Sequence, residues 1–394
     1  MRKLSLTFIF ILFITQVLFS QSNLVWKFQT KGRIYSTAVI SSKFVLFGSG
    51  DSSFYALDKE TGERIWQFIT GGTIHSDAAI ANESVFFGSS DSYIYSLNIN
   101  TGKLNWKFKT GTEKMLDIWD YYISSPVVKD ENVYYGSGDG NLYAINCLTG
   151  KLNWKFYSGH IIHAKPAIAG DKLYVGDFGG YFYAIDTKTG KLSWQFRTVG
   201  DTYFPNGEIQ KAAVYNDSIL YVGSRDFNIY AIDAKTGRAH WNMKETGSWI
   251  ISTPFIFKDY VYYGTSDTHR FYCANKNDGV IKWKIELPMR VYGSAVEYNN
   301  VIYFGCFDGI LRGVDFETGE LNWQFKTLAS EQNYHKVYTS EGHFRENFKL
   351  YGENYMEAEK MIHNLGSILS TPVIDNKTIY FGSSDGYLYE VKID

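Results

Sequence analysis

The chain has 394 residues, of which 18% are aromatic, and it contains 36 Gly but only six Pro. Its 39 basic and 41 acidic residues leave a formal net charge of −2, a balance that argues against binding to nucleic acid or to an anionic membrane surface. Abundant aromatic residues and glycines are typical of many short strands joined by tight turns.

Residues 1–20 have the organisation of a secretory signal peptide. Arg2 and Lys3 form a basic start, an apolar stretch runs from Leu4 to Phe19, and small polar residues follow. An uncleaved membrane anchor is the alternative, but about 16 residues are short for a span. No cysteine follows the apolar stretch, which argues against a lipid anchor. We therefore predict an exported protein, periplasmic or extracellular, with no transmembrane span in its mature chain.

A short phrase recurs along the rest of the chain, and its clearest copy covers residues 183–194. Tyr183 and Ile185 alternate with Ala184 and Asp186, which is the period of a half-buried strand, and Gly190 suits a tight turn. Each copy ends in a tryptophan. These tryptophans, together with one near the start of the chain, are Trp26, Trp66, Trp106, Trp154, Trp194, Trp241, Trp283 and Trp323. Their spacing of 40 to 48 residues is typical of a four-stranded propeller blade.

Four strands, A to D from the channel outward, are expected in each period. Strand A is expected at residues 34–40, 250–256 and 368–374, and strands C and D form the recurring phrase. Strand B occurs eight times, but the chain ends just after the eighth strand C. Residues 24–28 match the strand D at residues 104–108, so the N-terminal strand should complete the last blade and close the ring. The predicted fold is all-β: one domain, residues 21–394, forming an eight-bladed propeller of four-stranded antiparallel blades.

The phrase Ala-x-Asp-x-x-Thr-Gly-x-x-x-Trp, complete at residues 184–194, resembles the tryptophan-docking motif of the pyrroloquinoline-quinone-like (PQQ-like) β-propeller repeat family. The resemblance covers essentially the whole mature chain. It implies that each of the eight tryptophans packs between neighbouring blades and belongs to the scaffold. Some copies depart from the motif, as where Asn98 and Asn146 replace the aspartate.

Three insertions interrupt the repeat, at residues 111–121, 199–208 and 327–366. All three connect a strand D to the next strand A, so they should lie on one face of the propeller. The last contains a predicted helix at residues 354–363, with Tyr355, Met356 and Ile362 available for its apolar face. Function is often added where a repeat is broken, and the aromatic content of this insertion argues against disorder. We therefore expect the third insertion to be a lid or a docking element.

Two further tryptophans, Trp119 and Trp249, lie in D-to-A connections on the same face. Each is either a stacking platform for a ring-shaped ligand or a residue that packs its own loop. The starts of the strands A should converge on the central channel, and they carry a polar cluster. Its members are His75, Asp77, His163, Lys165 and Lys211. This cluster either binds an anion or a carboxylate, or it is a solvated channel wall.

Two other residue patterns are attributed to structure. Seven of the eight B-to-C turns carry an aspartate, which is a preferred turn residue. The three cysteines are Cys147, Cys273 and Cys306. They have neither the even number of a disulfide framework nor the spacing of a zinc site, so no metal is predicted.

The favoured function is a non-catalytic, monomeric scaffold that binds an envelope protein or a polysaccharide through the insertion face. In length the chain resembles the non-enzymatic, BamB-like members of the family, although the lipid-anchor cysteine is missing. One alternative is an alcohol or sugar dehydrogenase that uses pyrroloquinoline quinone and calcium. The resemblance implies that such an enzyme is much longer and carries two adjacent cysteines, which this chain lacks. The other alternative is a carbohydrate-binding propeller. No catalytic residue and no cofactor are predicted.

Overall fold

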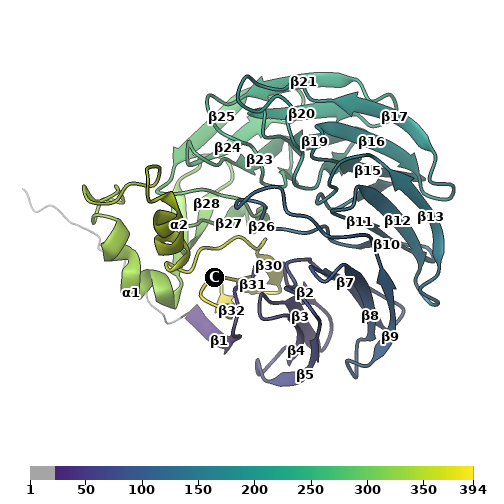
Figure 1. Cartoon of the computed structure of the whole chain (residues 1–394). Helices are drawn as coiled ribbons and strands as arrows, with labels where there is room; N and C mark the ends of the chain where they lie inside the picture. Colours follow the sequence, from purple (N-terminus) through teal and green to yellow (C-terminus); the bar gives the residue numbers. More distant parts are fainter. Residues whose placement is uncertain (1–22, 394) are drawn as a thin grey trace, which may run out of the picture.

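The computed structural model describes residues 23–393. Its 32 strands form eight antiparallel, four-stranded sheets, arranged as the blades of a ring (Figure 1). The predicted eight-bladed propeller is therefore confirmed. The predicted signal peptide lies outside the described residues. Of the helices at residues 23–393, none combines the length and the apolar character needed to cross a bilayer.

Each blade contributes one strand to each of four layers, from the channel outward. The innermost strands are β2 (Val39–Ile40), β6 (Ala79–Ala81), β10 (Val127–Lys129), β14 (Ala167–Ala169), β18 (Val214–Asn216), β22 (Phe255–Phe257), β26 (Val296–Tyr298) and β30 (Val373–Asp375). The second strands are β3 (Phe44–Gly48), β7 (Ser84–Ser89), β11 (Asn132–Gly136), β15 (Lys172–Gly176), β19 (Ile219–Gly223), β23 (Tyr260–Gly264), β27 (Val301–Gly305) and β31 (Thr378–Gly382).

The third strands are β4 (Ser53–Asp58), β8 (Tyr93–Asn98), β12 (Asn141–Asn146), β16 (Tyr181–Asp186), β20 (Asn228–Asp233), β24 (Arg270–Asn275), β28 (Ile310–Asp315) and β32 (Tyr387–Lys392). The outermost strands are β5 (Arg64–Ile69), β9 (Leu104–Lys109), β13 (Leu152–Tyr157), β17 (Leu192–Arg197), β21 (Ala239–Lys244), β25 (Ile281–Glu286), β29 (Leu321–Lys326) and β1 (Leu24–Gln29). Blades are numbered 1 to 8, starting with β2.

The ring closes in blade 8 as the sequence predicts. β1, from the start of the chain, pairs antiparallel with β32, from its end, with Gln29 opposite Tyr387. Blade 8 therefore has the order β1-β32-β31-β30 and is held by main-chain hydrogen bonds between the two ends of the described chain. This pairing covers the edge that β32 would otherwise expose.

The innermost strands are shorter than predicted. Residues 34–40 were expected to form one strand, but only Val39 and Ile40 pair within blade 1. The N–H of Ile34 instead donates to the carbonyl of Ser383 in blade 8, over 3.0 Å. Next to it, the Ser36 hydroxyl bonds to both the N–H and the carbonyl of Gly48 and so replaces the sheet ladder. The first half of strand A is therefore shared with the preceding blade.

The docking tryptophans pack between blades as the family resemblance implies. Trp154 of blade 3 lies against Gly190 of blade 4 and donates its indole N–H to the Thr187 carbonyl over 3.0 Å. Equivalent bonds run from Trp26, Trp66, Trp106, Trp194, Trp241 and Trp283 to the next blade. Trp323 faces blade 8, where no hairpin joins the two outer strands, and it makes no such bond among the described residues.

Two helices belong to the third insertion: α1 (Leu328–Val337) and α2 (Tyr355–His363). They lie together at one side of the ring (Figure 1). The helix predicted at residues 354–363 corresponds to α2, whereas α1 was not predicted. Its N-terminus is capped by Thr327, whose side chain accepts the N–H of Ser330 over 3.1 Å.

The predicted apolar face of α2 is partly wrong. Ile362 is buried, but Tyr355 and Met356 are 39% and 56% exposed. The helix buries Glu359 and His363 instead. The reason is that His363 and Glu359 Oε1 find partners at the channel mouth, as described below, although Glu359 Oε2 has no hydrogen-bond partner among the described residues.

Six of the seven turn aspartates accept a main-chain N–H of their own turn, as predicted, whereas Asp267 accepts the hydroxyl of Tyr351 in the third insertion. Asp51 accepts the N–H of Ser53 over 3.1 Å and the hydroxyl of Tyr55 over 2.7 Å. In blade 4 the usual position is Gly179, and Asp177 takes over this role by accepting the N–H of Gly179. Cys147, Cys273 and Cys306 are buried and form no disulfide.

Candidate interaction face and central channel

The first and third insertions meet over one end of the channel, here called the channel mouth. The indole N–H of Trp119 donates to Glu359 Oε1 of α2 over 3.4 Å. The same carboxylate oxygen accepts a hydrogen bond from Arg290 Nη1 over 2.6 Å. Arg290 is 1% exposed and also donates to the hydroxyl of Tyr351. A buried ion pair therefore holds α2 against blade 7.

The second insertion joins this assembly through Trp249. The ring of Phe204 meets the indole of Trp249 edge to face, with centroids 5.0 Å apart. Trp249 in turn contacts Trp119 edge to face at 6.0 Å, and the Arg225 guanidinium lies 4.3 Å from its ring centroid. Trp249 is only 7% exposed. The structure thus brings together the two tryptophans singled out in the sequence, and both contact other parts of the protein.

Two buried arginines at this face, Arg225 and Arg290, were not among the site residues predicted from the sequence. Arg225 Nη1 pairs with Asp117 Oδ2 of the first insertion over 2.5 Å, and Arg290 pairs with Glu359. The sequence does contain a feature that could have indicated Arg225. In the B-to-C turn of blade 5, Arg225 stands at the position that Gly50 and Gly138 hold in blades 1 and 3. A long cation replaces glycine there because it reaches across the channel mouth to an insertion.

His363, at the end of α2, sits in the channel mouth between two tyrosine hydroxyls. Its Nδ1 lies 3.3 Å from the Tyr35 hydroxyl and its Nε2 lies 3.3 Å from the Tyr121 hydroxyl. Burial, helped by Arg33 and Arg290, lowers the pKa of His363 to about 3. The imidazole is therefore neutral at pH 7, with one nitrogen accepting and the other donating.

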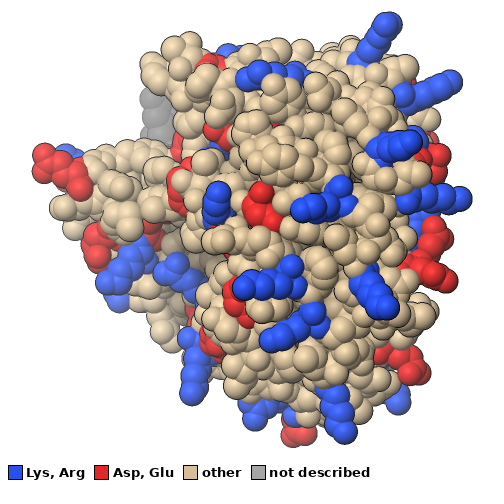
Figure 2. All heavy atoms as spheres, turned by 45° about the vertical axis from the view of Figure 1, so that its right-hand side comes forward, with Lys and Arg blue, Asp and Glu red and all other residues tan. Residues whose placement is uncertain are grey.

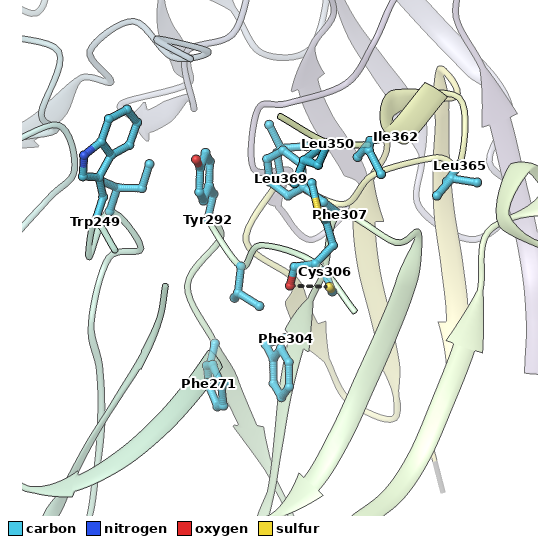
Figure 3. Packing of buried hydrophobic residues seen from close by; sticks show 14 of the residues in the cluster. Trp249, Phe271, Tyr292, Phe304, Cys306, Phe307, Leu350, Ile362, Leu365 and Leu369 are labelled. Carbon is cyan, nitrogen blue, oxygen red and sulfur yellow. Dashed lines mark hydrogen bonds between the residues drawn. The ribbon is translucent and has the colours of Figure 1, made fainter. Parts of the chain in front are cut away.

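Apolar side chains of the third insertion complete the closure. Ile362, Leu365 and Leu350 pack in one cluster with Phe307 and Leu369 of the blades (Figure 3). The same cluster extends outward between the sheets of blades 6 and 7 (Figure 3). The insertion is therefore continuous with the core.

The polar cluster predicted at the channel divides into two layers. His75 and His163, in the upper layer, hold the first insertion. His75 Nδ1 bonds to the Tyr121 carbonyl over 2.9 Å, and burial lowers the pKa of His75 to about 4. His163 lies 3.0 Å from Asp120 and 2.7 Å from Glu113. Burial lowers the pKa of His163, but these two carboxylates raise it further, to about 9, so His163 is a buried cation.

Asp77, Lys165 and Lys211 form the lower layer. They line a cavity of about 220 Å³ in the channel, below a roof that includes Tyr122 and His163. The structure thus places four of the five members of the predicted cluster around one cavity, although His163 is also bonded to the first insertion, and only His75 lies outside the cavity lining. Among the described residues, no group of three or more His, Cys, Asp or Glu side chains is arranged to hold a metal ion.

The insertions also expose apolar side chains. On the first insertion these are Met115, Leu116 and Ile118; on the second, Val199 and Tyr203; on the third, Tyr351, Tyr355 and Met356. A cavity of about 590 Å³ lies beside the first insertion and is lined by Arg33, His75, Met115, Ile118 and Tyr121 among others. Charges of both signs are interspersed over the face seen in Figure 2, with uncharged areas between them.

Comparison with known families shows to which protein family this chain belongs. The family model described as "Outer membrane protein assembly factor BamB" matches residues 17–156, 117–244 and 205–337, which together span most of the sequence. The chain belongs to the BamB family. Comparison with curated proteins finds no match.

Solved structures similar to this member of the BamB family include a BamB protein and two dehydrogenases. BamB from Moraxella catarrhalis is 16% identical, with a TM-score of 0.70 over 94% of this chain and 97% of that one. A europium-containing methanol dehydrogenase is 15% identical, with a TM-score of 0.70 over 94% and 93%. The quinohemoprotein alcohol dehydrogenase of Comamonas testosteroni is 13% identical, with a TM-score of 0.71 over 94% and 78%. The TM-scores show that these proteins share the fold of this chain, and at such low identities they show nothing more.

Proposed function

We propose that this chain is an exported, non-catalytic propeller that binds a partner protein of the cell envelope through its insertion face. The observation that carries the proposal is that three insertions, far apart in sequence, lock together and still expose apolar side chains. Met115, Tyr203 and Met356 are 67%, 81% and 56% exposed, one on each insertion. Exposed apolar groups gathered on one face are typical of protein-binding sites. Membership of the BamB family supports the same role.

The proposal includes no bound quinone. In the channel mouth the rings of Tyr121, Tyr292 and Phe307 pack with centroids 4.7 to 6.2 Å apart. His363 of α2 fills the space beside them and contacts Phe307 at 5.8 Å. The third insertion therefore fills this part of the channel mouth with its own side chain. A face closed in this way is suited to contact with a macromolecule.

The test is photo-crosslinking in cells that produce the full chain. A photoreactive amino acid is placed singly at Met115, Tyr203 or Met356. Matched controls are Leu148 and Val280, which are similarly exposed at 68% and 63% but lie in C-to-D turns on the opposite face. We expect the three insertion positions to yield a shared protein adduct that the controls do not. Adducts that are absent, or equal at both faces, would refute the proposal.

Point replacements are preferable to deleting residues 327–366. Ile362, Leu365 and His363 of this insertion are buried in the channel mouth. Their removal would expose the core, and loss of a partner would then report misfolding rather than loss of a docking surface.

A further inference from the structure

Inside the channel, residues just before the innermost strands form a series of hydrogen bonds between neighbouring blades. The Ser294 N–H donates to Thr371 Oγ1 over 3.1 Å, and the Thr371 N–H donates to Thr37 Oγ1 over 3.3 Å. The Thr37 N–H donates to Asp77 Oδ1 over 2.7 Å, and the Asp77 N–H donates to Ser125 Oγ over 2.9 Å. Blades 7, 8, 1, 2 and 3 are thus linked, each main chain to a side-chain oxygen of the next blade.

Among the described residues, this series of bonds does not continue from blade 3 through blades 4, 5 and 6 to blade 7, and in blades 4 and 5 the side chains themselves give the reason. The equivalent residues there are Lys165 and Ala212, and neither side chain offers an oxygen to the N–H of the preceding blade. Both residues line the cavity of about 220 Å³, and so does Lys211. Two ammonium groups therefore enter the channel within the interrupted part of this series.

The two ammonium groups are incompletely neutralised. Lys165 Nζ lies 3.7 Å from Asp77 Oδ2, with side chains 38% and 25% exposed. Lys211 is half-buried, and its Nζ lies 3.1 Å from the ring centroid of Tyr122. Among the described residues, Lys211 Nζ has neither a hydrogen-bond partner nor an ion-pair partner. His163, which also lines the cavity, faces two carboxylates of its own, Asp120 and Glu113.

The two lysines therefore share a single carboxylate, Asp77, in a partly desolvated space, and Lys211 has no acceptor among the described residues there. A half-buried ammonium without an acceptor is costly, and an anion removes that cost. At about 30 Å³ per water molecule, the volume corresponds to roughly seven waters. It suits a phosphate or a small dicarboxylate and is too small for a polymer.

We propose that this cavity binds a small oxyanion, a carboxylate or a phosphate, between Lys165 and Lys211. The two ammonium groups supply the charge, and hydroxyl groups such as those of Thr253 and Ser294 line the same cavity and can donate to the oxyanion. Lys165 is the exposed member of the pair, so the ligand enters past it. This site lies inside the channel, beneath the first insertion, and does not include the exposed apolar side chains proposed above to bind a partner.

The test uses the purified full-length mature chain and isothermal titration calorimetry at pH 7 and constant ionic strength. The probes are inorganic phosphate and malonate, which distinguish the two oxyanion classes, with chloride as the control for non-specific charge. We expect saturable binding of at least one probe and at least a tenfold weaker affinity in the double variant Lys165→Met/Lys211→Met.

The matched control is Lys188→Met, an exposed lysine in a C-to-D turn, which should bind like the wild type. Lys165→Met alone, at a partly exposed position, should weaken binding without a change in Tm and so separates charge loss from unfolding. Lys211→Arg should keep the affinity within a few-fold. Absence of saturable binding for both phosphate and malonate, or equal affinity in the double variant, would overturn the proposal.

Discussion

The indole rings of Trp119 and Trp249 meet edge to face, with centroids 6.0 Å apart, and join the first insertion to the connection that precedes blade 6. Trp119 also donates to Glu359 of α2. These two residues therefore link all three insertions, since Phe204 of the second insertion contacts Trp249.

Replacing Trp119 by Ala should loosen the insertion face without opening the propeller. The variant loses an aromatic pair worth about 0.5–1.5 kcal/mol beyond buried area, and the hydrogen bond to Glu359. We expect faster amide hydrogen exchange in residues 111–121 and in α2, with exchange in β16 unchanged. Trp119→Phe, which keeps a ring, should have a smaller effect. Unaltered exchange in α2 would show that Trp119 does not hold the helix.

Trp119 and Trp249 together test the alternative function, a propeller that binds carbohydrate. If Trp119 and Trp249 are a stacking platform, the double variant Trp119→Ala/Trp249→Ala should lose a polysaccharide that the wild-type chain retains in a pull-down. Equal behaviour of the two proteins would leave packing as their role.

Trp194→Ala should be more destabilising than Trp323→Ala. Trp194 packs on the hairpin of blade 5 and donates to the Ala234 carbonyl over 3.0 Å. Its loss should lower the free energy of unfolding by ~3–5 kcal/mol. Trp323 faces blade 8, which lacks that hairpin, so its loss should cost at least about 1 kcal/mol less. Urea denaturation measures both, and equal costs would contradict this account of docking.

The variants Gly237→Ala and Gly170→Ala separate two reasons for glycine in a turn: the positive φ and the close approach of a tryptophan ring. Gly237 has a φ of +74°, and a Cβ there would lie 2.6 Å from Trp194. Gly170 also has a positive φ, +56°, but nothing lies within 4 Å of its Cβ position. We expect Gly170→Ala to cost about 1–2 kcal/mol for the backbone alone. Gly237→Ala should cost a further ~1–3 kcal/mol for overpacking. Similar losses in the two variants would exclude the steric contribution of the indole.

His163 should make stability depend on pH. Its pKa in the folded protein is about 9, above the value of about 6.5 in an unfolded chain. The stabilisation is therefore complete below pH 6.5 and is lost as the pH rises through 9. The free energy of unfolding of the wild type should fall over this range relative to that of His163→Gln. The exposed His240→Gln serves as the control. Parallel profiles for the wild type and His163→Gln would show that the ion pairs contribute nothing.

Oxyanion binding should weaken in alkaline solution. Burial lowers the pKa of Lys211 to about 8, with Asp77 raising it and Lys165 lowering it. Tyr122 and His163 also face this lysine in the cavity. As the pH rises through 8, Lys211 loses its charge, so the Kd of phosphate or malonate should increase several-fold between pH 7 and 9. Lys211→Arg stays charged and should show a flatter profile. An identical profile in that variant would place the titrating group elsewhere.

The blade repeat could be read from the sequence because its signals are local. The turn at Gly190 and the strand ending at Trp194 lie within one hairpin, and the period of the tryptophans counts the blades. Even the ring closure was predictable, since residues 24–28 repeat the pattern of another outer strand. The length of strand A was not, because Ile34 bonds to Ser383 of a neighbouring blade.

The candidate sites depend on contacts between distant segments. The buried face of α2 was mispredicted because Glu359 and His363 find partners on Arg290, Tyr35 and Tyr121. The channel cluster was predicted as one group. In the structure its members bond differently, because Asp120 and Glu113 of the first insertion capture His163. No pattern along the chain indicates which carboxylate will reach which histidine.

By itself, the sequence determined the eight blades, the way the ring closes and the single face that carries the insertions, because strand period and turn chemistry act over a few residues. Only the tertiary structure decided that the insertions meet over the channel mouth and that Lys211 is left without an acceptor among the described residues of the channel. Those outcomes depend on which charged and aromatic side chains meet across the axis of the propeller, and burial makes each of those pairings energetically important.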